Sequence, residues 1–117
     1  MKRNWLMLLM CLFTILPLAS QAQFVVKEFD APGSEPRGLA WDGQYLWCAD
    51  CIDDSVFQMD PASGQVVHTT YFDFNTSNGG GVAWDSEATL WVTTGAYFYG
   101  LDAETGDTLK YFHCPGG

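Results

Sequence analysis

The sequence predicts an all-β fold, a partial β-propeller of two four-stranded antiparallel blades plus an N-terminal closing strand. The main observation is a repeat, because three segments of the chain each occur twice, at offsets of 42 to 44 residues. A period of roughly 40–50 residues is typical of a propeller blade with four strands. The repeated pairs are Gly38–Asp42 with Gly81–Asp85, Leu46–Trp47 with Leu90–Trp91, and Asp60–Gly64 with Asp102–Gly106.

The first 22 residues are expected to be a secretory signal peptide (residues 1–22) outside the fold. Lys2 and Arg3 supply a positive start, an apolar run follows from Trp5 to Leu18, and small residues before Gln23 suit cleavage after Ala22. The alternative, an uncleaved membrane anchor, needs about 20 apolar residues, and this run is shorter. The sequence therefore indicates a secreted or periplasmic protein with no membrane attachment after cleavage.

The chain is strongly acidic, with 14 Asp and Glu against 5 Lys and Arg and a net charge of −9. Beyond the N-terminal segment the basic residues are Lys27, Arg37 and Lys110. Such a surface repels nucleic acid and anionic membranes, so both are excluded as partners.

Residues 23–117 are expected to form the incomplete propeller, with blade one at about 36–73 and blade two at about 79–113. Strands are expected where β-branched and aromatic residues lie between turn residues, and no segment has the apolar spacing of a helix. Asp60–Gly64 has turn chemistry, because Asp caps its own backbone, Pro presets φ and Gly permits a positive φ. The predicted strands are Gly38–Asp42, Tyr45–Asp50, Ser55–Met59 and Gln65–Phe72, then Gly81–Asp85, Thr89–Thr94, Tyr97–Leu101 and Thr108–Phe112.

A further strand is predicted at the N-terminal end of the mature chain, over Gln23–Phe29. Val25–Gly33 aligns without gaps on Thr108–Gly116, which includes the last strand of blade two. The chain therefore opens on a fourth strand, and Val25–Phe29 is expected to complete the last blade of a closed ring. Asp42 and Asp85, which follow the repeated tryptophans, are expected to cap turns.

Two blades leave two apolar faces without a partner, and Trp41, Trp47, Trp84 and Trp91 are suited to fill the space between blades. Propeller rings hold about four to eight blades, and fewer than three repeats are not expected to be stable alone. The expected partners are therefore further blades of the same protein or other protomers. The chain stops inside a repeat, which favours a fragment of a longer protein over a protomer that closes a ring as a trimer or tetramer.

Three cysteines follow the signal segment: Cys48, Cys51 and Cys114. The spacing of Cys48 and Cys51 is that of a redox motif or half of a zinc site. A redox motif of this kind lies at the start of a helix, and no helix is predicted here. A four-cysteine zinc site needs a second pair of cysteines, which the sequence lacks. A local disulfide between Cys48 and Cys51, or two partly buried thiols, is therefore favoured.

The pattern Pro-x-Gly-Leu-Ala-Trp-Asp-Gly at Pro36–Gly43, then Leu46–Trp47 and Asp60–Gly64, resembles secreted β-propellers with NHL, YVTN or quinoprotein-like repeats. In WD40 repeats, by contrast, the Trp-Asp pair closes the third strand. Relatives with similar repeats are glutaminyl cyclotransferase-like proteins, streptogramin lyases, SMP-30-type lactonases and quinoprotein dehydrogenases. The resemblance implies the architecture, and none of their catalytic sets is carried over to residues of this chain.

Function is expected on one side of the ring, where connectors between blades meet the loops between second and third strands. The candidate ligand-binding residues there are Arg37, Asp50, Asp53 and Asp54. The carboxylates suit calcium, but Cys51 and Ile52 interrupt the ligand spacing, so a solvated acidic loop is favoured and the cofactor is unknown. Arg37 offers a fork of donors to an anionic ligand, although a salt bridge to Glu35 or Asp54 is favoured. The segments of this side are Ser34–Arg37, Cys51–Asp54, Thr76–Asn78, Gly95 and His113–Cys114.

Catalytic residues are not evident in the sequence. His68 falls on an outer strand, His113 has no second histidine at ligand spacing, and Ser55 and Ser86 lack a Gly-x-Ser-x-Gly setting. The favoured function is an exported β-propeller scaffold for ligand or protein binding. The alternative is an enzyme of the glutaminyl cyclotransferase, lyase or lactonase type, with its catalytic residues in blades that these residues do not include.

Overall fold

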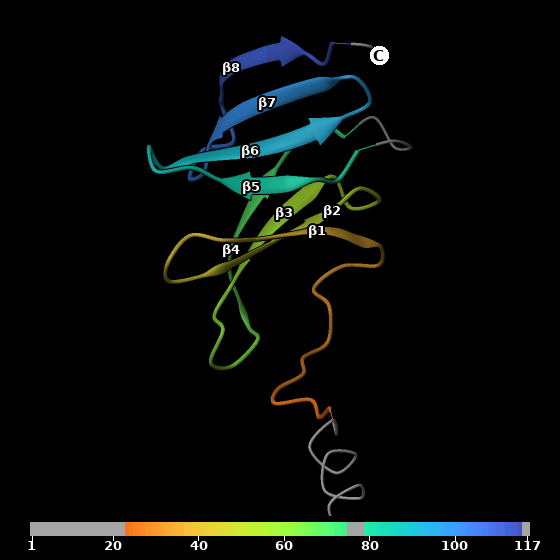
Figure 1. The fold of residues 1–117 in the computed structure, drawn as a ribbon, viewed down its shortest axis with the longest axis vertical. Helices are drawn as coiled ribbons and strands as arrows, with labels where there is room; N and C mark the ends of the chain where they lie inside the picture. The colour runs from red at the N-terminus through yellow and green to blue at the C-terminus, as the bar shows by residue number, and fades with distance from the viewer. Residues whose placement is uncertain (1–22, 75–78, 116–117) are drawn as a thin grey trace, which may run out of the picture.

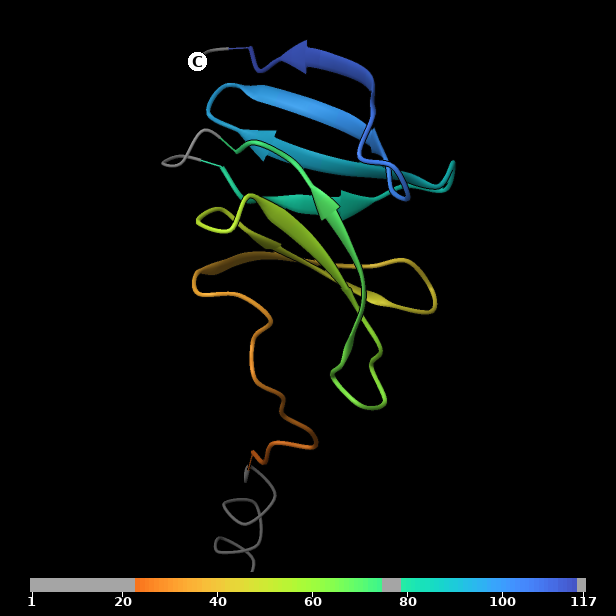
Figure 2. The same ribbon diagram turned by 180° about the vertical axis from the view of Figure 1, so that it is seen from behind.

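The computed structural model of the chain describes residues 23–74 and 79–115, and all of their regular structure is β (Figures 1 and 2). The strands form two antiparallel four-stranded sheets, in the orders β1-β2-β3-β4 and β5-β6-β7-β8. This confirms the predicted fold class. The predicted signal segment lies outside the described residues. The strands are β1 (Pro36–Trp41), β2 (Leu46–Asp50), β3 (Ser55–Met59), β4 (Val66–Tyr71), β5 (Val82–Trp84), β6 (Thr89–Thr94), β7 (Tyr97–Asp102) and β8 (Thr108–His113).

The repeated turn between third and fourth strands has the same construction in both blades. Asp60 Oδ1 accepts a hydrogen bond from the backbone N–H of Ala62 at 2.8 Å, and Asp102 Oδ1 accepts one from that of Glu104 at 2.9 Å. Gly64 and Gly106 close the two turns with φ angles of 73° and 80°, a region in which other residues are strained. The turn chemistry predicted from the sequence is therefore present twice.

The aspartate of each Trp-Asp pair orients a tryptophan on the next strand of its own blade. Asp42 Oδ2 accepts from Trp47 Nε1 at 2.8 Å, and Asp85 Oδ2 accepts from Trp91 Nε1 at 2.7 Å. The other oxygen of Asp42 accepts from the backbone of the turn, at Tyr45, at 2.6 Å. Each carboxylate thus caps its turn, as predicted, and also fixes an indole ring.

The hydrophobic core lies between the two sheets. The ring of Trp47 on β2 stacks on the ring of Trp84 on β5, with centroids 5.6 Å apart and an interplanar angle of 15°. The surrounding side chains come from both blades and are almost fully buried. They are Ala49, Cys51 and Val56 of blade one, Leu90, Val92 and Leu101 of blade two, and Phe74 of the connector.

Two features hold the sheets in this position. Gly38 of β1 lies so close to Gly80 that a side chain on Gly38 would overlap the carbonyl oxygen of Gly80. On the outer strands, Thr70 Oγ1 donates to the carbonyl of Ala103 at 2.6 Å, and His68 Nε2 lies 3.1 Å from the carbonyl oxygen of Glu104. The apolar core therefore lies between the backbone contact of Gly38 with Gly80 and the side-chain hydrogen bonds made by β4.

Gln23–Phe29, which the sequence predicts as a strand, lies outside both sheets in the described residues. A strand needs a neighbour for its backbone groups, and no strand of residues 23–74 and 79–115 lies beside the segment. The segment instead contacts the β3–β4 turn, where Lys27 Nζ donates to the carbonyls of Pro61 and Ala62 at 2.9 and 2.7 Å. Closure of a ring by these residues stays a prediction. Within the described ranges, no helix has the length and apolarity to cross a membrane.

Removing the stacked ring should separate the blades. We expect Trp84→Ala to lower the free energy of unfolding by about 3 kcal/mol, because the substitution leaves a cavity beside Trp47. Trp41→Ala is the matched control, since Trp41 holds the equivalent place on the other blade but is 52% exposed, and its loss should change stability by only about 0.5 kcal/mol. Urea unfolding of both variants measures the difference, and equal losses would contradict the interface.

Acid should destabilise the fold through its turn aspartates. Hydrogen bonds from Trp91 and then Thr89 hold the pKa of Asp85 below its usual value, and those from Thr105 and Glu104 lower that of Asp102. For Asp42, burial raises the pKa, but the bonds from Tyr45 and Trp47 outweigh it. Groups with depressed pKa values stabilise the fold above the unfolded pKa of about 3.9, and this stabilisation is lost as pH falls through the folded values.

The free energy of unfolding should therefore be steady near neutral pH and fall below about pH 4. Asp85→Asn should be less stable at pH 7 and should show a shallower decline in acid, because one of the titrating groups is gone. Glu28→Gln, which removes one charge outside the sheets, serves as the control. An unchanged acid slope in Asp85→Asn would show that this carboxylate has no part in the transition.

Candidate functional site

One side of the two sheets gathers the connectors between blades and the β2–β3 and β6–β7 loops, and we call it the loop face (right side of Figure 1). Three hydrogen bonds link its segments. The N–H of Ser34 donates to Asp53 Oδ2 at 3.3 Å, that of Phe74 to Asp54 Oδ1 at 3.1 Å, and that of Cys114 to the carbonyl of Ala96 at 2.6 Å. The predicted segments on this side are therefore brought together, except Thr76–Asn78, which lie outside the described residues.

Asp50, one of the predicted site residues, is completely buried at the end of β2. Its Oδ2 accepts from the N–H of Glu35 at 2.6 Å, and its Oδ1 accepts from those of Ile52 and Asp53 at 2.9 and 3.0 Å. A side chain on Gly33 would overlap the carboxylate, so the connector lies directly over it. Asp50 therefore fastens the connector to the loop and has no surface open to a ligand.

Asp53 and Asp54 lie in the loop that follows. Asp54 adopts a φ of 47°, and its carbonyl accepts from the N–H of Phe72 at 3.0 Å. Together with the bond from Phe74 to its side chain, this contact ties the loop of blade one to the connector that leads into blade two. Asp53 is exposed and binds the connector through Ser34 alone among the described contacts.

Arg37 forms an ion pair with Glu35, with Nη2 and Oε1 2.5 Å apart. Glu35 was one of the two partners that the sequence indicated. Hydrogen bonding and charge attraction from Glu35 raise the pKa of Arg37 above its usual value. Both side chains are partly exposed, so the pair lies at the surface of the loop face, where such pairs stabilise little.

The sequence left a disulfide between Cys48 and Cys51 as one of two alternatives, and the structure shows two buried free thiols instead. Cys48 lies on β2, whereas Cys51 lies in the turn that follows this strand. Cys51 packs in the core between the blades, whereas Cys48 pairs with Leu39 on the opposite face of blade one. Burial raises the pKa of both thiols, which keeps them protonated at neutral pH.

The acidic loop at Asp50, Asp53 and Asp54 has the oxygen ligands that calcium prefers. In residues 23–74 and 79–115 no group of three or more His, Cys, Asp or Glu side chains is arranged to hold a metal ion. The oxygens of Asp50, Asp53 and Asp54 are directed at backbone N–H groups of the connectors. These carboxylates therefore serve as caps for the loop face.

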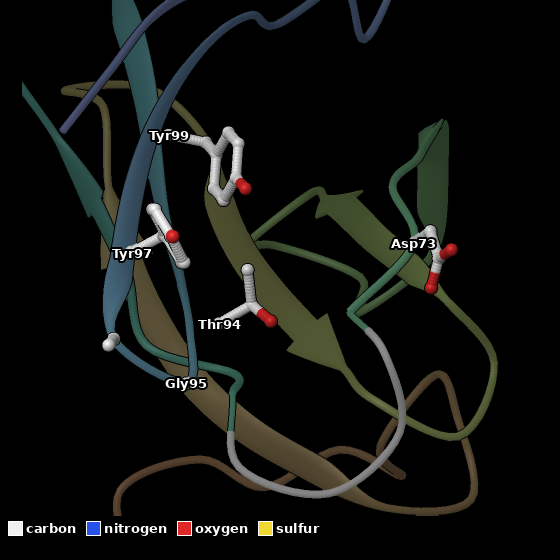
Figure 3. Close-up of a pocket in the computed structure, with 6 residues that line it drawn as sticks. Asp73, Thr94, Gly95, Tyr97 and Tyr99 are labelled. Carbon is white, nitrogen blue, oxygen red and sulfur yellow. The ribbon is translucent and has the colours of Figure 1, made fainter. Parts of the chain in front are cut away.

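A groove of about 420 Å³ opens on the loop face beside these residues (Figure 3). Tyr97 and Tyr99 of β7 and Thr94 of β6 lie along one side, and Asp73 lies across from them on the connector that follows β4. The turn at Gly95 and Ala96 forms its end. The groove thus lies between a strand pair of blade two and the link from blade one.

The walls of the groove are fixed by packing. Thr94 Oγ1 donates to the carbonyl of Phe74 at 2.9 Å. The ring of Tyr97 lies 6.1 Å from that of Tyr99 and 5.0 Å from that of His113, between centroids. Tyr99 also lies 5.2 Å from Phe72. An ordered row of aromatic rings therefore faces a carboxylate-bearing segment.

Sequence reasoning missed the tyrosines of this groove. Tyr97 and Tyr99 are two apart on a predicted strand, so alternation alone placed them on one face. Their position beside Gly95, which was assigned to the loop face, was a usable signal. Asp73 could not be chosen in this way, because its place depends on the path of the connector.

Comparison with known proteins supports the fold. A search against protein-family models finds no match, and a search of curated proteins finds none. Among solved structures, the chain is similar to the crystal structure of Myxococcus xanthus glutaminyl cyclase, with a TM-score of 0.57 and 18% sequence identity. The match covers 67% of this chain and 32% of that chain, so this chain spans about a third of its length. At this identity the likeness concerns the fold, which is of the β-propeller type.

Loss of the Asp50 carboxylate should release the connector from the loop face. We expect Asp50→Ala to lower the free energy of unfolding by at least about 2 kcal/mol, because buried N–H groups lose their acceptor. Trypsin should also cut faster after Arg37. Asp53→Ala, which removes a single exposed acceptor, is the control and should change stability by about 0.5 kcal/mol or less. A native-like cleavage rate in Asp50→Ala would contradict this role.

Proposed function

We propose that the chain is an exported β-propeller scaffold, part of a larger ring, that binds a positively charged organic ligand at its loop face. The observation that carries the proposal is the groove lined by Tyr97, Tyr99 and Asp73. Aromatic faces attract organic cations, and a carboxylate across the groove adds an opposite charge. Such a group on a protein partner, for instance a lysine or arginine side chain, would suit the same groove.

The charge distribution of the chain supports a cationic ligand. Acidic residues outnumber basic ones by 14 to 5. The basic side chains of the described residues have internal contacts, with Lys27 on two carbonyls, Arg37 on Glu35, and Lys110 3.8 Å from Glu87. The negative potential of the surface is therefore little offset, which raises the local concentration of cations.

The residues singled out by sequence have a supporting role in this proposal. Asp50, Asp53 and Asp54 hold the connectors that form the border of the loop face. Arg37 is paired with Glu35, so binding of an anionic group by Arg37 requires that this exposed pair open. Contact of Arg37, Asp53 and Asp54 with a ligand stays a prediction, whereas Asp50 is buried.

The proposal is tested with three probes of one shape and different charge: phenethylammonium, 2-phenylethanol and 3-phenylpropionate. Only the cation should bind, and added salt should weaken its binding. Tyr97→Leu should weaken it about 2- to 5-fold, as expected for loss of one cation–π contact of roughly 0.5–1 kcal/mol. Chemical-shift titration of the purified chain gives the affinities.

Tyr71→Leu is the matched control, because Tyr71 is an exposed tyrosine of blade one that does not line the groove. Its binding should equal that of the unmodified chain. Equal binding of the anion and the cation, or an equal loss in both tyrosine variants, would overturn the proposal.

The second candidate function is an enzyme of the glutaminyl cyclase, lyase or lactonase kind, favoured by the structural match to a glutaminyl cyclase. In that case the catalytic residues lie in blades beyond the two described here. The purified chain should then be inactive on a glutaminyl peptide, while a longer polypeptide containing these blades should cyclise it. Loss of that activity with a chelator would indicate a metal-dependent reaction. Inactivity of the longer polypeptide would exclude the cyclase form of this candidate.

A further inference from the structure

The outer edge of blade two is formed by β8, and no strand in the described part of the chain lies beyond it. The N–H of Cys114 donates to the carbonyl of Ala96, in the same register as the pairing of β7 with β8. Hydrogen-bonded and non-hydrogen-bonded pairs alternate along an antiparallel ladder. Phe112 is therefore bonded to β7, whereas Tyr111 and His113 direct their backbone N–H and C=O groups outward.

The outer edge of blade one, formed by β4, is covered by comparison. The N–H of Phe72 donates to the carbonyl of Asp54, so by the same alternation Tyr71 directs its backbone groups outward. The turn of blade two lies over this position, because a side chain on Gly106 would come within 3.0 Å of the carbonyl oxygen of Tyr71. All six residues of β8 are exposed, and its edge is the open one of the two.

The aromatic wall of the groove continues onto one face of β8. The ring of His113 lies 5.0 Å from that of Tyr97, and the ring of Tyr111 stacks on that of Tyr99 at 6.0 Å with an interplanar angle of 25°. Tyr111 is 66% exposed, so blade one leaves this part of the sheet uncovered. A strand placed along β8 would therefore extend the wall of the groove outward.

We propose that β8 binds an extended segment of another protein as an antiparallel fifth strand, with an arginine of that segment opposite His113. The inference rests on the proposed function, because it specifies the cationic partner of the groove. The outward backbone groups of Tyr111 and His113 provide the hydrogen bonds of the added strand, and the side chains that face the groove provide specificity. Pairing of this kind satisfies an edge that is otherwise open.

The position opposite His113 favours a long cationic side chain. It lies two strand spacings, about 10 Å, from β7, so only a long side chain can approach the ring of Tyr97 from there. A guanidinium group stacks flat on aromatic rings, which His113 and Tyr97 supply, and Asp73 across the groove adds the opposite charge (Figure 3). A second copy of the chain fits this edge less well, because two copies with a net charge of −9 each repel one another.

The probe is the peptide acetyl-Thr-Val-Thr-Arg-Thr-Val-Thr-amide, added to the purified full chain. As a strand it carries its arginine and valines on one face and its threonines on the other. In the free chain the amides of Lys110 and Phe112 should exchange slowly with solvent, and those of Tyr111 and His113 rapidly. Saturation with the peptide should abolish the rapid exchange of Tyr111 and His113, as followed by NMR.

Two methylated forms of the peptide decide whether its backbone binds. In the added strand the arginine and the valines direct their N–H groups toward β8, and the threonines direct theirs away. Methylation of the arginine and valine nitrogens should weaken binding at least about tenfold, because two or more backbone hydrogen bonds are lost. Methylation of the threonine nitrogens is the matched control and should leave binding unchanged.

Substitution of Tyr111 tests the same bonds from the side of the chain. Tyr111→Pro removes an N–H that β7 does not use, a position at which an edge strand accepts proline. Tyr111→Val removes the ring alone. Binding to Tyr111→Pro should be about fivefold weaker than binding to Tyr111→Val, as expected for one hydrogen bond.

The outcomes separate this proposal from that for the groove, and phenethylammonium binding is measured beside them. Absence of peptide binding, equal effects of the two methylated peptides, or rapid exchange of Tyr111 and His113 in the complex would overturn the strand addition and leave the groove as a cation site. Equal binding of a peptide with glutamate in place of arginine would overturn both. Protection of the two amides without peptide, at raised protein concentration, would make a second copy the occupant and overturn the proposal.

Discussion

A four-stranded blade cannot bury its apolar faces by itself, and the contact that meets this need here is the stack of Trp47 on Trp84. Trp47 Nε1 donates a hydrogen bond to Asp42, and this bond orients the indole ring that stacks on Trp84. The close approach of Gly38 to Gly80 and the bond from Thr70 to Ala103 fix the same separation at the two ends of the sheets. The fold thus rests on one aromatic contact with a polar support behind it.

The same packing determines what the loop face can do. Asp50 and Asp54 fasten the described connector residues Glu35 and Phe74 with buried or half-buried hydrogen bonds. The groove between Tyr97 and Asp73 lies beside these fastened residues. Charged residues that looked like ligands for a metal are used for this fastening, while the groove itself is lined by tyrosines.

The sequence predicted every strand of both sheets to within two residues, because the repeat and its turns are local signals. It also gave Glu35 as one of two alternative partners of Arg37, and the structure shows this pair. The strand predicted at Gln23–Phe29 stays a prediction, because its formation depends on a neighbouring strand that the described residues do not supply. The burial of Asp50 could not be predicted from the sequence, because it results from the segment at Gly33, which lies over the end of β2. Prediction therefore succeeded for structure within a repeat and for the packing of Trp47 and Trp84 between the blades, and it failed for the burial of Asp50.

The bond from Asp42 to Trp47 has a consequence for how such chains grow. On one face, each repeat carries a tryptophan, Trp47 or Trp91, whose ring is oriented by the aspartate of the same repeat. On the other face it carries the tryptophan, Trp41 or Trp84, that is equivalent to the second ring of the stack. Duplication of the gene segment for one repeat therefore copies both halves of a junction at once. Adding a blade therefore requires no newly evolved surface. A substitution at either tryptophan affects only the one interface between blades in which that ring packs.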